Sequence, residues 1–166
     1  MPGPFIHDID PVFGQIGPLY LWWYGLSYSA GFLALFHWLR TVRDSLGLDV
    51  RQVYDLVLLV CAGVLLGGRS IEVIFYEWAY YGEHTLHIPW IWLGGMSTHG
   101  ILLGATLATW LFCRLHGQKF LALADELVLP AALIMGLGRL GNFIDGQIVG
   151  SITEVSWAVK FPDVEG

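Results

Sequence analysis

This sequence of 166 residues is poor in charge and in cysteine. Charged residues make up only 13% of it, whereas hydrophobic residues make up 55% and the mean hydropathy is +0.61. Soluble domains carry about 25% charged residues, so this composition predicts that lipid surrounds most of the chain. The two cysteines, Cys61 and Cys113, lie in apolar runs, where we expect small hydrophobic side chains and no disulfide framework.

Basic residues are the scarcer kind of charge. Eight Lys and Arg stand against 14 Asp and Glu, which gives a net charge of −6 without any Lys/Arg cluster. Nucleic-acid phosphates would repel such a chain, so we expect no nucleic-acid partner. Apart from one histidine discussed below, the histidines show no spacing typical of a metal site, and we expect neither a metal nor another cofactor. These histidines are His7, His37, His84, His87 and His116.

The sequence does contain long apolar runs. A bilayer core of roughly 30 Å needs about 20 apolar helical residues, and four stretches approach that length: 17–39, 53–75, 94–113 and 122–144. Backbone hydrogen bonds in lipid must be satisfied within the chain, and these runs are too long for barrel strands. We therefore predict an all-α, polytopic transmembrane helix bundle with about four spans, in one membrane domain covering residues 1–166.

The distribution of basic residues predicts the orientation of these spans. Lys and Arg in short loops favour the cytoplasmic side, and the loops after the first and third stretches hold Arg40, Arg43, Arg51, Arg114 and Lys119. The N-terminal segment and residues 76–92 contain none, so both are expected outside the cytoplasm. The aromatic residues that suit this outer interface are Trp22, Trp23, Tyr76, Trp78, Trp90 and Trp92.

Two glycine pairs lie within these runs. Gly63 precedes Gly67 by four residues, and Gly100 precedes Gly104 by the same spacing. Small residues four apart share one face of a helix and let two helix backbones approach closely. We interpret both pairs as packing surfaces.

Two arginines remain once the loops and the tail are counted. Arg69 lies in LLGGRSIEVIFY and Arg139 lies in GLGRLGNFIDG, both close to membrane depth. An arginine there costs at least ~2.5 kcal/mol, so each is a candidate functional residue. The alternative is a structural ion pair, for which the available acidic partners are Glu72, Asp125, Glu126 and Asp145.

The glycines around Arg139 allow two interpretations. Residues 136–142, GLGRLGN, match the glycine pattern of dinucleotide-binding loops, but that motif needs a preceding strand. An apolar helical run containing Pro130 precedes it here, so we reject this interpretation. Glycines also leave a backbone surface free of side chains around one guanidinium group, whose planar donors match a phosphate. A phospholipid headgroup could approach there.

His99 and Tyr24 complete the set of candidates. His99 lies in GGMSTHG, residues 94–100, at the start of the third stretch. The glycines of this segment would leave it accessible, and histidine titrates near neutral pH, although a packing role is the alternative. Tyr24 alone would be an ordinary interfacial aromatic residue.

Four segments carry a resemblance to a known family: WYGL at 23–26, LGGR at 66–69, GGMSTHG at 94–100 and GRLGNFIDG at 138–146. In this order they resemble the prolipoprotein diacylglyceryl transferases. The resemblance implies a multi-pass enzyme of the bacterial inner membrane whose active face is periplasmic. Such an enzyme moves the diacylglyceryl group of phosphatidylglycerol to the lipobox cysteine thiol in the signal peptide of a preprolipoprotein. A thioether forms and glycerol 1-phosphate is released.

The resemblance also assigns residues to this chemistry. It implies that His99, Arg139 and Tyr24 are catalytic, and the residues that it implies for phosphatidylglycerol binding are Arg139, Asn142, Gly141, Gly146 and Arg69. A thiol is mostly protonated at neutral pH and needs a base or a positive field, which His99 or Arg139 could supply. Arg139 is further expected to stabilise charge on the departing phosphate.

The chain departs from the family pattern at several positions. Gln147 stands where family members usually have Glu, and Ser151 stands where they usually have Arg. Ile71 and Glu72 replace a Gly-Tyr pair. About three further helices with another essential arginine are absent, so we expect residues 1–166 to be the N-terminal part of a protein with about seven spans.

Three other interpretations stay open. A divergent or inactive paralogue would explain Gln147 and Ser151. A small membrane transporter could use Arg69, Arg139 and Glu72 along a path, although no sequence repeat is evident. A purely structural helix bundle would leave the four family segments unexplained.

Overall fold

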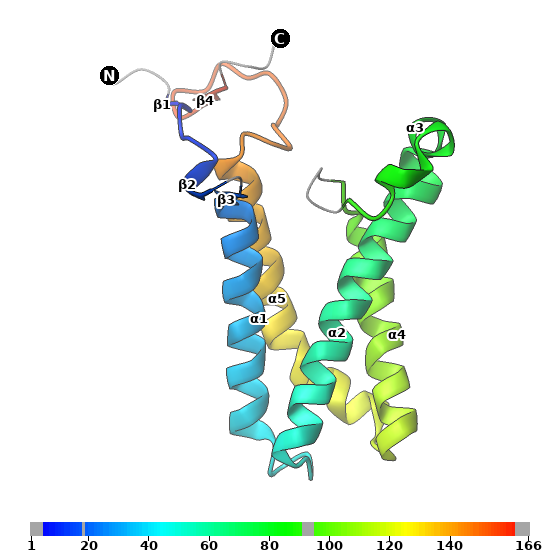
Figure 1. The fold of residues 1–166 in the computed structure, drawn as a ribbon. Coiled ribbons are helices and arrows are strands. Elements are labelled where there is room, and N and C mark those ends of the chain that lie inside the picture. The colour runs from blue at the N-terminus through cyan, green and yellow to red at the C-terminus, as the bar shows by residue number, and fades with distance from the viewer. Residues whose placement is uncertain (1–4, 18, 91–94, 162–166) are drawn as a thin grey trace. The chain divides into compact units, whose positions relative to one another are not determined.

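The computed structural model describes residues 5–17, 19–90 and 95–161, and these are mostly helical (Figure 1). The long helices are α1 (Trp23–Val42), α2 (Val50–Ile71), α4 (Thr98–His116) and α5 (Phe120–Ile144). A π-helical turn, η1 (Glu72–Tyr76), continues α2 and is followed by α3 (Trp78–Glu83) and a 3-10 turn, η2 (Thr85–His87). The strands are short: β1 (Phe5–Ile6), β2 (Val12–Ile16), β3 (Leu19–Trp22) and β4 (Val159–Lys160).

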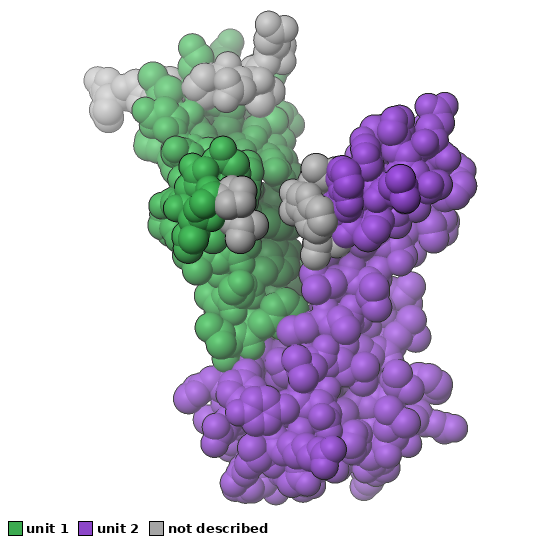
Figure 2. Space-filling model, in the orientation of Figure 1, with its two compact units in different colours: residues 1–34, 130–166 green, residues 35–129 purple. Residues whose placement is uncertain are grey.

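The chain divides into two compact units, coloured separately in Figure 2. Unit 1 comprises residues 1–34 and 130–166, and unit 2 comprises residues 35–129. Unit 1 therefore holds the four strands, the first part of α1 and the last part of α5. Unit 2 holds α2, η1, α3, η2 and α4.

The predicted helical fold is confirmed. Each of the four predicted stretches contains most of one long helix. Among the described residues, Val50–Tyr76 and Phe120–Ile144 are long and apolar enough to cross a membrane, with mean hydropathies of 2.0 and 1.9. Length and composition alone support this conclusion for these two helical segments.

The predicted start of the first stretch is wrong. Leu19–Trp22 form strand β3 and not the start of a helix, because β2 pairs antiparallel with β3 and places Val12 opposite Trp22. Aromatic side chains favour strands, and Gly17 has a φ of +58°, a conformation that glycine adopts readily in a turn. Consequently α1 begins only at Trp23.

The predicted start of the third stretch is also too early. Helix α4 begins at Thr98 because Ser97 caps it, and the Ser97 hydroxyl accepts a hydrogen bond from the Gly100 N–H at 3.4 Å. Gly95 has a φ of +78°, which is outside helical geometry. Two residues that the sequence assigned to this region lie outside the described ones: Gly94 and Trp92.

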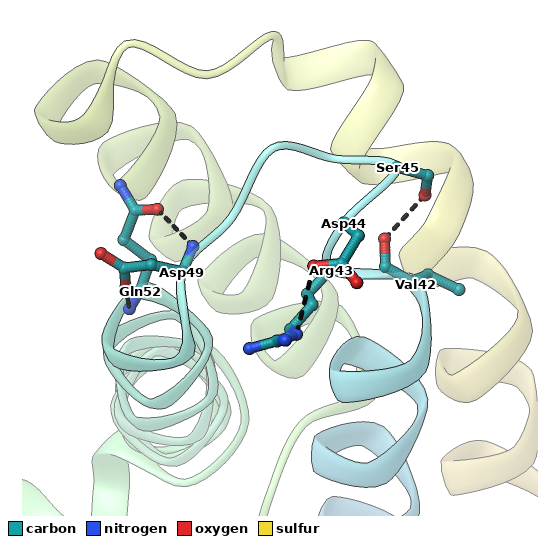
Figure 3. Close-up of polar contacts among 6 residues, drawn as sticks. All are labelled: Val42, Arg43, Asp44, Ser45, Asp49 and Gln52. Atoms are coloured by element: carbon teal, nitrogen blue, oxygen red, sulfur yellow. Dashed lines mark hydrogen bonds and ion pairs between the residues drawn. The ribbon is translucent and has the colours of Figure 1, made fainter.

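The loop between α1 and α2 determines where α2 begins (Figure 3). The Asp49 carboxylate accepts a hydrogen bond from the Gln52 N–H at 2.7 Å, and the Gln52 side-chain oxygen accepts one from the Asp49 N–H at 2.9 Å. This reciprocal capping box satisfies N–H groups that a helix start leaves open. At the end of α1 the Ser45 hydroxyl donates to the Val42 carbonyl at 2.6 Å.

Helices α2 and α4 pack closely within unit 2 because glycines line their contact. A Cβ added at Gly67 would lie 2.8 Å from the Gly104 Cα. Cβ atoms at Gly100 and Gly104 would collide with the carbonyl oxygens of Gly67 and Gly63. The predicted packing role of both glycine pairs is confirmed. The buried apolar side chains of these two helices include Leu56, Val60, Val64 and Phe112.

Candidate functional site

In unit 1 the last part of α5 lies against the first part of α1, and glycines permit the contact. A Cβ at Gly138 would lie 2.9 Å from the Tyr28 hydroxyl oxygen, and one at Gly141 would lie 3.0 Å from the Tyr24 ring. A larger side chain would force these tyrosines to move, because packed side chains leave little room for added atoms. The glycines on either side of Arg139 therefore bring its helix against two tyrosines.

Tyr24 is half-buried in the first turn of α1. Its hydroxyl lies 3.4 Å from the Tyr28 hydroxyl, and the two ring centroids are 4.9 Å apart. The charged groups of Arg139 and Asp145 are both near enough to interact with the Tyr24 phenol. Three of the predicted site residues, Tyr24, Arg139 and Gly141, are thus brought together.

The Arg139 side chain is exposed. Within the described part of the chain, no group forms an ion pair or a hydrogen bond with its guanidinium group. The ion pair that the sequence allowed, for example with Asp145, does not form there. The planar donors of Arg139 are therefore available to an anion that approaches from outside.

The chain turns sharply after α5. The Gln147 N–H donates to the Asn142 carbonyl at 2.8 Å, and the Asn142 side-chain amide donates to the Gln147 side-chain oxygen at 3.4 Å. Gly146 has a φ of +67°, which glycine adopts without strain. Burial raises the pKa of the Asp145 carboxyl, whose Oδ1 has no hydrogen-bond partner among the described residues. Asn142 and Gly146 therefore lie in one tight turn that follows Arg139.

His7 supports this turn and was missed by the sequence analysis. It is 7% exposed, and its Nε2 lies 2.6 Å from the Phe143 carbonyl oxygen. A carbonyl only accepts hydrogen bonds, so Nε2 carries the donated proton. The imidazole also lies 4.8 Å from the Phe161 ring, measured between centroids, and β1 pairs with β4 beside it. No local sequence pattern could reveal a contact between residues 136 positions apart.

In unit 2, His99 is the second residue of α4 and follows the Ser97 cap. Its side chain is exposed, as the glycines around it led us to expect. The imidazole Nδ1 lies 3.5 Å from the Tyr76 hydroxyl, at the limit of a hydrogen bond. The ring is thus accessible and only weakly held.

Arg69 lies near the end of α2 and is only 5% exposed. Its guanidinium group donates hydrogen bonds to the Tyr81 hydroxyl and to backbone carbonyls of the segment between η1 and α4. The two arginines that the sequence singled out therefore have opposite environments.

The predicted site residues fall into two groups. Those of unit 1 are Tyr24, Arg139, Gly141, Asn142 and Gly146, and those of unit 2 are Arg69 and His99. Among the described residues there is no cluster of three or more His, Cys, Asp or Glu side chains that could hold a metal ion.

The sequence matches a family model, prolipoprotein diacylglyceryl transferase, over residues 11–166. Similar proteins named phosphatidylglycerol–prolipoprotein diacylglyceryl transferase occur in several bacteria. The protein of Legionella pneumophila (strain Lens) is 41% identical over 165 residues, which cover 95% of this chain and 62% of the relative. The protein of Geobacter sulfurreducens is 43% identical over 156 residues, covering 93% and 60%. The protein of Neisseria gonorrhoeae (strain NCCP11945) is 44% identical over 161 residues, covering 94% and 56%.

The chain spans about three fifths of the length of the curated relatives that it matches. The family match includes all four long helices, and with them the glycine-lined face of α5 and the capped start of α4. The chain therefore belongs to the prolipoprotein diacylglyceryl transferase family.

Proposed function

We propose that this protein transfers the diacylglyceryl group of phosphatidylglycerol to the lipobox cysteine thiol of preprolipoproteins. The family match and the names of the relatives support these substrates. In this proposal α1, α2, α4 and α5 are four spans of the bacterial inner membrane. The N-terminus and the active face lie on the periplasmic side, because five of the eight basic residues lie in or next to the loops at the opposite ends of the helices: Arg40, Arg43, Arg51, Arg114 and Lys119.

The environment of Arg139 carries this proposal. Its guanidinium group is exposed on the helix whose Gly138 and Gly141 pack against Tyr28 and Tyr24, and it has no hydrogen-bond or ion-pair partner within the described part of the chain. An arginine near membrane depth costs at least ~2.5 kcal/mol, and an external anion would offset part of that cost where no internal ion pair does. A phosphate fits the planar guanidinium fork well, and a phospholipid presents one at the membrane surface.

The reaction is a displacement at carbon. The cysteine sulfur attacks the diacylglyceryl carbon that bears the phosphate, and the carbon–oxygen bond breaks. The bonding electrons leave with glycerol 1-phosphate, a carbon–sulfur thioether forms, and a base takes the thiol proton. Arg139 stabilises the negative charge that develops on the departing phosphate oxygen, and this interaction is stronger in the transition state than in the ground state.

His99 is the proposed base that takes the thiol proton. Its imidazole is exposed, has only a 3.5 Å contact with Tyr76, and belongs to the residue type that titrates near neutral pH. A positive field from Arg139 is the alternative way to favour the thiolate. The residues proposed to shape the headgroup site are Tyr24, Gly141, Asn142 and Gly146, of which Tyr24 lies within electrostatic reach of Arg139.

Gln147 and Ser151 favour a second candidate, a divergent or inactive paralogue. In the family pattern these positions usually carry a Glu and an Arg. Gln147 lies in the turn after α5, where its side chain contacts Asn142, so a neutral amide lies next to the proposed headgroup site. An amide forms weaker hydrogen bonds to a ligand than a carboxylate does, which would alter the handling of the lipid headgroup.

A transfer assay in detergent tests the proposal. Phosphatidylglycerol and a lipobox peptide are supplied to the chain and to the full product of the gene that encodes it, and thioether formation is measured. Arg139→Ala is compared with Arg51→Ala, a matched control that removes an exposed arginine from the first turn of α2. Loss of transfer in Arg139→Ala alone supports the phosphate role, whereas full activity in Arg139→Ala refutes it.

Two further outcomes separate the candidates. Full activity in a His99→Gln variant removes His99 as the base. Transfer by neither protein favours the paralogue, and then the double substitution of Gln147→Glu and Ser151→Arg is expected to restore activity.

A further inference from the structure

The guanidinium group of Arg69 is surrounded by acceptors from the connecting segment, which we define as residues 77–90 and 95–97. Nε donates to the Ile88 carbonyl at 2.8 Å. Nη2 donates to the His87 carbonyl at 3.1 Å. These bonds hold η2 and the residue after it against the end of α2.

Further bonds extend this contact on both sides. Nη2 donates to the Tyr81 hydroxyl at 2.9 Å, and the guanidinium carbon lies 4.7 Å from the centre of the Tyr81 ring. Nη1 donates to the Gly95 carbonyl at 3.2 Å, and Nη2 donates to the Trp90 carbonyl at 3.4 Å. Because Arg69 is 5% exposed, these charge-assisted bonds form away from water, where they are strong and costly to lose.

The same segment leads directly into α4. The Ser97 N–H donates to the carbonyl of Gly68, the residue before Arg69, at 3.1 Å. A Cβ added at Gly95 would lie 3.3 Å from Arg69 Nη1, so the backbone passes close to the guanidinium group. Ser97 then caps α4, whose second residue is His99. Only a few residues of backbone thus separate the Arg69 contacts from the His99 imidazole.

We infer that Arg69 is a positioning residue that holds the connecting segment on the end of α2 and thereby fixes the start of α4 and the place of His99. The inference rests on the proposed function, since it names what orients the proposed base. A direct phosphate contact, which the resemblance suggested for Arg69, would require the phosphate to displace backbone carbonyls from a buried site.

Two substitutions at Arg69 separate these roles kinetically. Arg69→Lys keeps the positive charge but lacks the planar fork of donors. A positioning role predicts that kcat for transfer by the full gene product falls about tenfold or more in both Arg69→Lys and Arg69→Met, while KM for phosphatidylglycerol changes less than about twofold. A phosphate contact predicts the opposite: Arg69→Lys keeps most activity, and KM rises in Arg69→Met.

Hydrogen–deuterium exchange gives a readout that does not depend on activity. The N–H groups of Ile88 and Ser97 each bond to a carbonyl within unit 2. In both Arg69 variants these two amides are expected to exchange about tenfold faster, because local opening costs less free energy. The Val53 N–H, in the first turn of α2, keeps its rate. Arg51→Lys is the matched control and leaves all three rates unchanged.

A milder variant keeps the inference testable even if the Arg69 variants fail to fold. Tyr81→Phe removes the hydroxyl that accepts from Nη2 and keeps the ring over which the guanidinium lies. It is expected to raise the exchange rate of the Ile88 amide about threefold, since one hydrogen bond of several is lost. An unchanged rate in this variant and in Arg69→Lys overturns the inference.

Combining the exchange rates with the transfer kinetics gives two further outcomes that test the inference. Faster exchange with an unchanged kcat overturns the inference, because the segment would then not place the reacting group. Absence of transfer in the unmodified full gene product refutes the proposed function and the role assigned to His99. In that case faster exchange in the Arg69 variants still supports the part of the inference that concerns the connecting segment.

Discussion

Arg69 and Arg139 look alike in the sequence and differ in the structure. Each follows a glycine near the end of a long apolar helix, α2 for Arg69 and α5 for Arg139. Arg69 is buried and donates to at least four backbone carbonyls, whereas Arg139 is exposed and makes no hydrogen bond or ion pair within the described part of the chain. We therefore propose that Arg69 serves the fold and Arg139 serves a ligand, and the occupancy of their donors distinguishes the two roles.

Removing the Arg139 guanidinium group should have the largest effect on function. We expect Arg139→Ala to lower kcat/KM for transfer by the full gene product about 100-fold or more, because one preorganised donor to developing charge is worth roughly 3 kcal/mol. Thermal unfolding should shift by less than about 2 °C, since the side chain has no internal partner to lose. Kinetics and a thermal scan in detergent measure both quantities. A large loss of stability would instead place Arg139 in the same class as Arg69.

Removing the Arg69 guanidinium group should lower stability. Arg69→Met is expected to lower the free energy of unfolding by about 3 kcal/mol, because buried carbonyls and the Tyr81 hydroxyl lose a charged donor. Denaturant titration in detergent measures this change. Arg51→Met provides the exposed control, for which a change below about 0.5 kcal/mol is expected. If the two variants were equally stable, Arg69 would not hold the connecting segment.

Alanine substitutions at the glycines near the two arginines should also have opposite effects on stability. Gly67→Ala would place a Cβ 2.8 Å from the Gly104 Cα, and overpacking of this kind costs about 1–3 kcal/mol. Gly136→Ala meets nothing within 4 Å, so the better helix propensity of alanine should raise stability by up to about 1 kcal/mol. Denaturant titration of both variants checks the contrast. A destabilised Gly136→Ala protein would contradict it.

The smallest expected effect concerns Asp145, one of the acidic residues that could have paired with Arg139. Burial raises the pKa of its carboxyl, so its contribution to stability is fully present below the unfolded pKa of about 3.9 and is lost as pH rises through the folded pKa. The melting temperature of the Asp145→Asn variant should therefore rise relative to that of the unmodified protein as pH increases from about 4 to about 7. An ion pair with Arg139 would lower the pKa and reverse this sign, so thermal scans across that pH range decide between them.

Most of the helical architecture could be predicted because the length and composition of an apolar run determine it. The helix starts could not. Leu19–Trp22 are apolar enough to extend a span, and only the pairing of β2 with β3 makes them a strand. The start of α4 depends on the Ser97 cap, a local signal that the apolar count of the third stretch concealed.

The sequence motifs could predict which residues belong to the candidate site, but they could not predict what those residues contact. Gly141 and Tyr24 could be named from motifs, and their contact follows from helix packing that no motif states. The partners of Arg69 could not be named, because most are backbone carbonyls, which every residue offers, and they lie 18 to 26 positions away. His7 was missed for the same reason: its acceptor is the Phe143 carbonyl.

The use of main-chain oxygens around Arg69 bears on how freely the protein can vary. Every residue keeps a backbone carbonyl when its side chain is exchanged, so a substitution at Ile88 can alter the surface without removing an acceptor of Arg69. Evolution can therefore change the side chain that this position exposes while the connecting segment stays hydrogen-bonded to Arg69. The same tolerance makes position 88 suitable for a spectroscopic label that reports on this segment.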